Sequence, residues 1–174
     1  MLADETYGAD PKFLDGIAAL EKWYFVEVPV STQVWVGRVE VEPAGQGPMG
    51  RPRQSARVVA GTPPRREVGH IAAQLPERAW RYYTIKEGTK GSIQAEFTLV
   101  RVTRSKKGDR PGAEATAVFR RCLEDGTMRV FLTNAPKRIA KRKLVWVGGM
   151  RWPIETAFEE AKGEVGMDHY EVRT

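Results

Sequence analysis

The stretch Tyr24-Phe25-Val26-Glu27-Val28-Pro29-Val30 decides the fold class. It is short and almost entirely apolar, which is typical of a strand buried in a sheet that is covered on both faces. Upstream, Asp10-Pro11 has the composition of a helix start, and apolar residues at helical spacing predict an amphipathic helix over residues 11–22. Still earlier, Leu2-Ala3-Asp4 has the pattern of a strand end. A strand end, a helix and a buried strand in this order predict an α/β fold.

The pattern changes after this strand. Residues 37–66 are rich in glycine, proline and arginine and predict a basic, turn-rich segment. The sequence then predicts a short helix over 67–75 and strands over 80–86, 93–103, 115–123 and 128–133, with Asp125-Gly126 as the hairpin turn between the last two. We therefore expect one domain, in which a basic β-rich insertion over residues 32–147 separates α/β parts at 1–31 and 148–174.

Charge is distributed unevenly along the 174 residues. The chain has 28 Lys/Arg and 22 Asp/Glu, a net charge of +6, and its 41% hydrophobic content excludes a disordered tail. Residues 31–147 hold 23 basic and 10 acidic residues, whereas both ends are acidic. A basic middle between acidic ends suits a protein that binds phosphates with one part and a cation with another. Charge alone favours the alternative that the arginine-rich segments are simply solvated faces.

Two classes of protein are excluded by simple counts. The sequence contains no stretch of about 18 uncharged apolar residues and no secretory signal pattern, so we expect no contact with a membrane. The single cysteine, Cys122, cannot form an internal disulfide or a zinc cluster, which fits a reducing compartment. We therefore expect a cytoplasmic protein.

A cluster of cations precedes the C-terminal segment. Five of the seven residues from 137 to 143 are basic, namely Lys137, Arg138, Lys141, Arg142 and Lys143. Such a cluster is a candidate patch for the DNA backbone. A solvated helix end is the alternative.

The C-terminal segment from Arg151 to Val165 has a helical pattern, with Pro153 in its first turn. Arg151, Glu155 and Lys162 are spaced i, i+4 and i+11, which places them on one helix face. A carboxylate between two cations stays ionised and can hold a divalent metal or form an ordinary salt bridge. Spacing alone favours the salt bridge.

The surrounding residues resemble a known family. Arg151-Trp152-Pro153-Ile154-Glu155, Lys162-Gly163-Glu164 and the segment from Gly166 to Arg173 resemble bacterial insertion-sequence transposases of the DDE (RNase H-like) superfamily with a Y-x2-R-x3-E-x6-K signature. Leu2-Ala3-Asp4 and the following Tyr7-Gly8 turn resemble the segment around that family's second aspartate. The tyrosine of the signature falls on Gly148, so this element is missing.

The resemblance implies a metal-dependent DNA strand cleavage and transfer reaction at insertion-sequence ends. It implies that Asp4 and Glu155 are catalytic ligands of two Mg²⁺ or Mn²⁺ ions, and that Arg151 and Lys162 bind the end of a double-stranded transposon DNA. The fold implied is an incomplete RNase H-like domain carrying a β-rich insertion. Trp80, Trp146 and Trp152 are interpreted as core residues, although an aromatic residue in such an insertion can stack on a flipped base.

One element of the family pattern has no counterpart. The family's first aspartate lies on a strand that would precede Met1, so we expect a C-terminal piece of a transposase that is catalytically incomplete by itself. Two alternatives remain: a non-catalytic DNA-binding fragment that regulates intact transposase or forms mixed or homo-oligomers, and a decayed remnant.

Overall fold

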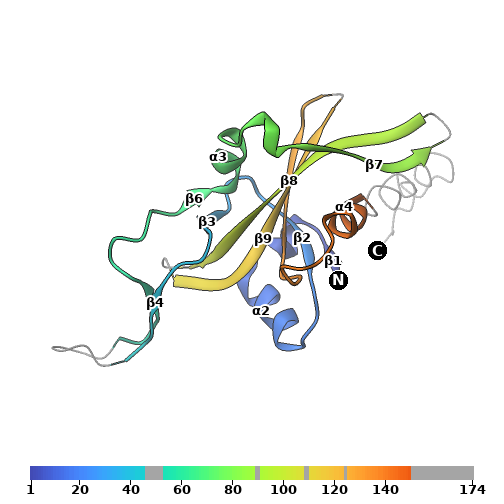
Figure 1. Cartoon of the computed structure of the whole chain (residues 1–174). Coiled ribbons are helices and arrows are strands. Elements are labelled where there is room, and N and C mark those ends of the chain that lie inside the picture. The colour runs from blue at the N-terminus through green and yellow to red at the C-terminus, as the bar shows by residue number, and fades with distance from the viewer. Residues whose placement is uncertain (46–52, 89–90, 108–109, 124, 150–174) are drawn as a thin grey trace, which may run out of the picture.

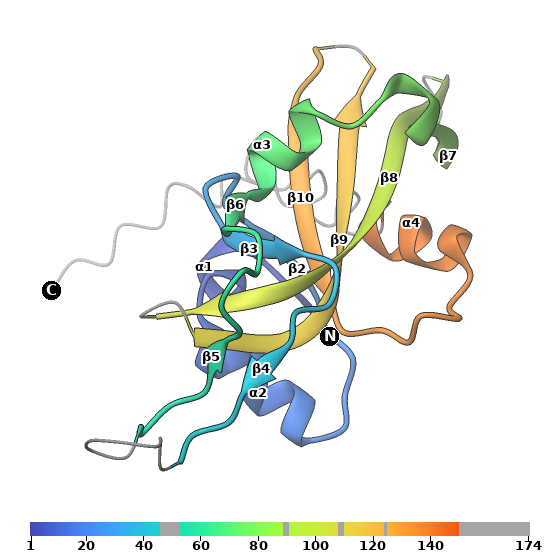
Figure 2. The same cartoon turned by 60° about the vertical axis from the view of Figure 1, so that its left-hand side comes forward.

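The computed structural model describes residues 1–45, 53–88, 91–107, 110–123 and 125–149. It is a mixed α/β structure built around one large, mainly antiparallel sheet (Figure 1, Figure 2). The strands are β1 (Leu2–Ala3), β2 (Phe25–Val28), β3 (Gln33–Val36), β4 (Val41–Glu42), β5 (Arg57–Val58), β6 (Arg66–Glu67), β7 (Arg81–Gly88), β8 (Gly91–Lys106), β9 (Arg110–Cys122) and β10 (Met128–Thr133). The helices are α1 (Glu5–Gly8), α2 (Pro11–Ala19), α3 (Val68–Ala73), the 3₁₀ turn η1 (Glu77–Ala79) and α4 (Lys141–Gly149).

The N-terminal elements follow the predicted order of strand, helix and strand. β1 pairs in parallel with β2, so Leu2 lies opposite Phe25. Asp10 caps α2 with its side chain, as predicted, by accepting a hydrogen bond from the backbone N–H of Lys12. α2 ends at Ala19 and not at residue 22, because Glu21 adopts a φ of 54°, which a right-handed helix cannot include.

The later strands continue the same sheet. Its order is β1-β2-β10-β9-β8-β3-β6, and β7 also pairs with β8. The long strand β8 pairs with β7 along its first half and with β3 along its second half. The turn between β9 and β10 contains Gly126 at a φ of 69°, which agrees with the predicted Asp125-Gly126 hairpin. Residues from 1–31 and from 32–147 therefore share one sheet.

Helices cover both faces of this sheet. On one face, which we call the α2/α3 face, Val26, Phe119 and Leu132 pack with Leu14 of α2 and Ile71 of α3. On the other, the α4 face, side chains of the alternate strand positions pack with Leu144 and Val145 of α4; they are Phe25, Phe97, Val118 and Phe131. The sheet thus has two apolar sides, and both are needed to bury it.

The basic segment at 37–66 contains more regular structure than its turn-rich composition predicts. β4 and β5 form a small antiparallel sheet that extends away from the main one (Figure 2). Glu42 accepts hydrogen bonds from Arg53 Nη1 at 2.5 Å and Arg57 Nε at 2.8 Å, so two of the segment's arginines are used to hold this arm together. Among the described residues, no helix is long and apolar enough to cross a membrane.

Candidate carboxylate site and nucleic-acid interface

Asp4 lies at the carboxyl end of β1, where the chain turns into α1. Its backbone is still extended, with φ −82° and ψ −177°, and its side chain caps α1 by accepting a hydrogen bond from the Tyr7 N–H at 3.3 Å. The residue is half-buried. A carboxylate held in this way at a strand end has a fixed position, which metal binding or phosphate chemistry requires.

The sheet register brings a second carboxylate level with Asp4. Leu2 pairs with Phe25 and Ala3 with Val26, so the next residue along each extended strand is Asp4 in one and Glu27 in the other. Glu27 is mostly buried, with 13% of its side chain exposed, and it forms an ion pair with Arg129 at 3.3 Å. α1 packs closely against the backbone of β2 at Glu27, since a Cβ on Gly8 would lie 1.8 Å from the Glu27 carbonyl oxygen. The amino-acid sequence does not single out Glu27, because a lone acidic residue inside an apolar strand belongs to no motif.

The chemistry of Asp4 fits one ligand of a hard divalent cation, because Mg²⁺ and Mn²⁺ prefer carboxylate oxygens. The described residues contain no group of three or more His, Cys, Asp or Glu side chains that could hold a metal ion. Glu155, Arg151 and Lys162 lie outside the described residues, as does Trp152. Asp4 can therefore be one part of a metal site, and its predicted partner lies in the part of the chain that the structure does not describe.

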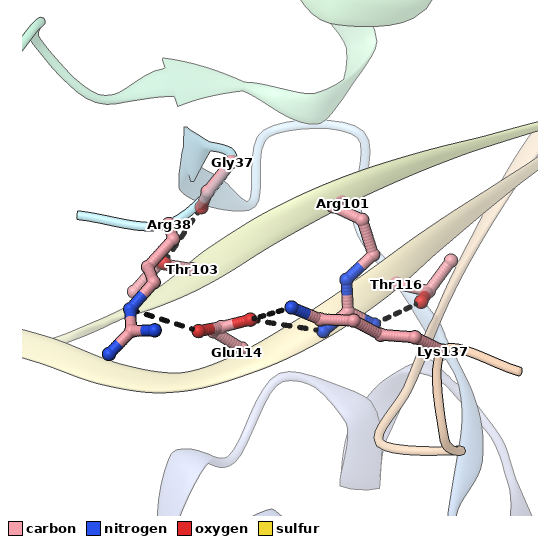
Figure 3. A network of polar contacts seen from close by, with 7 residues as sticks. All are labelled: Gly37, Arg38, Arg101, Thr103, Glu114, Thr116 and Lys137. Carbon is pink, nitrogen blue, oxygen red and sulfur yellow. Dashed lines mark hydrogen bonds and ion pairs between the residues drawn. The ribbon is translucent and has the colours of Figure 1, made fainter.

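A network of cations surrounds Glu114 on the α4 face (Figure 3). Glu114 on β9 contacts Arg38 Nε at 3.5 Å, Arg101 Nη2 at 3.3 Å and Lys137 Nζ at 3.2 Å. Arg101 is further fixed by donating to Thr116 Oγ1 at 2.6 Å. The hydrogen bonds from Lys137 and Arg101 lower the pKa of the Glu114 carboxyl below its usual value. One negative and three positive charges leave a basic surface that is organised by this carboxylate.

The predicted 137–143 cluster adjoins this network. Its five cations are all exposed, and they lie in the turn before α4 and in the first turn of that helix. Cations at a helix start are not stabilised by the helix dipole, so helix stability does not explain their positions. The structure joins the cluster to the network through Lys137, which the sequence could not show because Arg38, Arg101 and Glu114 come from three distant segments.

Comparison with known families matches residues 1–92 of the chain to the DDE superfamily endonuclease family. The chain belongs to this family. The match includes Asp4, β1, β2 and the basic arm of β4 and β5, and it confirms the predicted DDE transposase-type domain. No curated protein matches the chain in a search of its full sequence.

Membership defines the substrate class of this DDE endonuclease as DNA, and nucleases of the family usually use divalent metal ions. A basic, solvent-exposed face agrees with that class of substrate. The mixed α/β structure with a mostly sheet core is also consistent with a DDE nuclease domain.

Two tryptophans of the DDE endonuclease differ in their exposure to solvent. Trp80 is 5% exposed beneath the Arg121 guanidinium, whose carbon lies 4.6 Å from the ring centre, and it is a core residue as predicted. Trp146 is 56% exposed, so its predicted core position is wrong: in α4 the face with Leu144 and Val145 packs on the sheet while Trp146 points outward. Trp146 lines a hollow of about 690 Å³ between α4 and β7, together with Tyr82 and Arg142.

Proposed function

We propose that the chain is the part of an insertion-sequence DDE transposase that contributes the second aspartate, the glutamate helix and a basic β-rich insertion to DNA strand cleavage and transfer. The observation that carries this proposal is the position of Asp4, a carboxylate fixed at the end of β1 within the family match. The RNase H-like parts are residues 1–31 and 148–174, and the insertion is residues 32–147. In this arrangement the strands of the insertion continue the sheet from β2 onward, beginning with β10. Asp4 follows β1, which is the terminal strand on the other side of β2.

In this proposal Asp4 and Glu155 hold divalent metal ions, Mg²⁺ or Mn²⁺, which supply activation of the attacking oxygen and stabilisation of the leaving oxygen at one phosphodiester. Arg151 and Lys162 bind phosphates of the transposon end next to these carboxylates. Asp4 keeps its orientation because its other interaction, with the Tyr7 N–H, fixes the side chain at the start of α1. In this proposal the protein residues position the DNA and the metal ions.

The position of β1 at the edge of the sheet supports the proposal that the unit is catalytically incomplete. β1 pairs with β2 on one side and ends the sheet order on the other. Beside it lies an apolar groove of about 380 Å³, lined in part by Leu2, Phe25 and Leu144. Within the part of the chain that the structure describes, this edge of β1 has no strand partner, and a strand edge beside apolar side chains is suited to pair with a further strand. We infer that such a strand brings the family's first aspartate to this edge, whether from an intact transposase or from another polypeptide.

The exposed 137–143 cluster and the Glu114 network form the proposed surface for the DNA backbone. Replacing Lys141 and Arg142 by glutamate is expected to reduce the slope of log affinity against log salt by about one unit for each phosphate that the variant no longer neutralises. The matched control is Lys12→Glu, an exposed cation on α2 at the other face of the sheet. Equal slopes for the cluster variant and the control would remove this surface from the proposal.

Cleavage and metal binding test the catalytic part of the proposal. We expect the purified chain to bind Mn²⁺ weakly in calorimetric titration, and Asp4→Asn to abolish that binding. Asp10→Asn is the matched control, because Asp10 is also a helix-capping carboxylate but lies at the start of α2. Unchanged Mn²⁺ binding in Asp4→Asn would exclude Asp4 as a ligand. Efficient Mg²⁺-dependent nicking by the chain alone, abolished by Glu155→Gln, would show that the unit is complete.

A second function is favoured by the exposed cations of the 137–143 cluster, because they can bind a DNA backbone without any cleavage. The chain could bind transposon ends without cutting them and so compete with an intact transposase, or form mixed or homo-oligomers through the β1 edge. Selective retention of an end-sequence duplex over a random duplex, without cleavage, supports this regulatory function. A non-cooperative thermal transition would instead support a decayed remnant.

A further inference from the structure

A second basic site lies on the α2/α3 face, on the opposite side of the sheet from the Glu114 network. It is a hollow of about 220 Å³ at the end of β8, closed on its other sides by β3 and by the junction of α1 and α2. The charged side chains that line it are Arg65, Arg104 and Lys106, and Ser105 contributes a hydroxyl group. The hollow has room for several water molecules at about 30 Å³ each, and hence for a small ion with part of its hydration shell.

Among the residues that the structure describes, those that line this hollow include three cations and no carboxylate. Asp15 on α2 contacts two of these cations from outside the hollow, and both of its oxygens are used: Oδ1 lies 2.5 Å from Arg104 Nη2 and Oδ2 lies 2.5 Å from Lys106 Nζ. The other carboxylate at the start of α2, Asp10, points to the backbone N–H of Lys12. The hollow itself is therefore lined by positive charge, which suits the negative charge of a phosphate group.

The cations are held in place before any ligand arrives. Arg104 is 3% exposed, and its guanidinium carbon lies 5.9 Å from the centre of the Tyr24 ring. Arg65 Nη1 donates to Ser105 Oγ at 3.1 Å, which directs this guanidinium to the end of β8. Long basic side chains on a free surface lose rotamer entropy when they bind an anion, whereas side chains already fixed by neighbours lose less.

The hydrogen bonding around Arg104 is also incomplete. Arg104 Nε and the Tyr24 hydroxyl are both buried and have no hydrogen-bond partner among the described residues. Buried polar atoms without a partner are uncommon in folded proteins and often indicate a water molecule or an ion nearby. Of these two residues, Arg104 lines the hollow, and Tyr24 lies behind the Arg104 guanidinium.

We propose that this hollow is a binding site for a tetrahedral phosphate-type oxyanion, which is either one phosphate of a DNA backbone or free inorganic phosphate. The site contains guanidinium and ammonium groups that donate to an oxyanion at several angles, and guanidinium is suited to bidentate contact with phosphate. It is separate from Asp4 and does not depend on cleavage activity.

Titration with inorganic phosphate at constant ionic strength tests the site, with thermal melting and ³¹P NMR as measurements. Phosphate should raise the melting temperature more in the unsubstituted protein than in Arg65→Gln, because a bound ligand stabilises by mass action whereas the general salt effect of phosphate acts on both proteins alike. Arg65→Gln should weaken phosphate binding at least tenfold, and it leaves the ion pairs of Asp15 with Arg104 and Lys106 unchanged. Lys107→Gln is the matched control, since Lys107 is an exposed cation next to Lys106 and does not line the hollow.

A second measurement distinguishes the two sources of phosphate. Affinity for a random DNA duplex is measured over a range of salt concentrations for Arg65→Gln, Lys106→Gln and the control. A smaller salt slope in the two pocket variants than in Lys107→Gln identifies a backbone phosphate; equal slopes with weakened phosphate binding identify the free anion. Equal effects of phosphate on the melting temperatures of the unsubstituted protein and Arg65→Gln, or equal phosphate affinities for Arg65→Gln and Lys107→Gln, would overturn the site.

Discussion

Lys137 Nζ lies 3.2 Å from Glu114 Oε2, and this contact connects the 137–143 cluster to strand β9 (Figure 3). Glu114 is 31% exposed in its side chain and is also shared with Arg101 and Arg38. An exposed ion pair of this kind adds little to stability, because solvent and salt screen it. Its larger effect is electrostatic, since the carboxylate offsets part of the positive charge that a DNA backbone would meet.

Glu114→Gln is therefore expected to strengthen DNA binding. Removing the carboxylate frees three cations to contact phosphates, so the affinity for a random duplex should rise and its salt dependence should become steeper. Fluorescence anisotropy at several salt concentrations measures both. Glu77→Gln is a matched control, because Glu77 is likewise an exposed carboxylate paired with an arginine, Arg121, in another part of the molecule. A similar gain in both variants would indicate only a change in net charge.

Trp146→Ala is expected to weaken the binding of single-stranded oligonucleotides. Trp146 and Tyr82 are exposed on the same hollow as Arg142, and an aromatic ring stacked on a base contributes about 1–3 kcal/mol. Fluorescence anisotropy of a labelled oligonucleotide measures the affinity of each variant. Trp23→Ala controls for exposure, since Trp23 is 51% exposed but lies at the apolar groove beside β1. If Trp23→Ala has the greater effect, the hollow between α4 and β7 is not the stacking site.

Two glycine substitutions should have opposite effects on the free energy of unfolding. In Gly8→Ala the new Cβ would lie 1.8 Å from the Glu27 carbonyl oxygen, so α1 must move, at an expected loss of about 1–3 kcal/mol. In Gly16→Ala the new Cβ has no neighbour within 4 Å among the described residues, and the better helix former should stabilise α2 by up to about 1 kcal/mol. Urea denaturation measures both. Asp4 caps the start of α1, so a movement of this helix also moves its carboxylate. Gly8→Ala should therefore reduce Mn²⁺ binding if Asp4 is a ligand, whereas Gly16→Ala should not.

The pH dependence of stability should include a contribution from Asp15. Partial burial raises the pKa of its carboxyl, but hydrogen bonds from Lys106 and Arg104 outweigh this and hold the pKa below its ordinary value of 3.8. The folded state therefore binds this proton less readily than the unfolded state, so the contribution is complete above pH 3.8 and is lost as the pH falls below it.

Asp15→Asn should consequently reduce the loss of stability as the pH falls through this range, as measured by urea midpoints. The side chain is 39% exposed, so solvent screening limits the change to about 1 kcal/mol or less. Asp10→Asn replaces a carboxylate of the same helix that accepts a backbone hydrogen bond. If both substitutions reduce the loss of stability at low pH equally, the ion pairs of Asp15 with Arg104 and Lys106 have no specific role in it.

Local signals in the sequence were sufficient for most secondary structure. Three predictions are confirmed: the helix start at Asp10-Pro11, the apolar strand around Val26 and the turn at Asp125-Gly126. Each of them depends only on residues that are close together in the sequence. The end of α2 was predicted less well, since the positive φ of Glu21 is not encoded by a glycine. The roles of Glu155, Arg151 and Lys162 stay predictions.

The neighbours of each charge were decided only by the tertiary structure. The amino-acid sequence determined that residues 31–147 carry an excess of cations and that Asp4 follows a strand. It could not determine that β8 places Arg101 on one face with Glu114 and Arg104 on the other with Asp15. The physical reason is that side chains alternate along a strand, so the register of long-range pairing decides which charges meet, and that register depends on packing both faces at once.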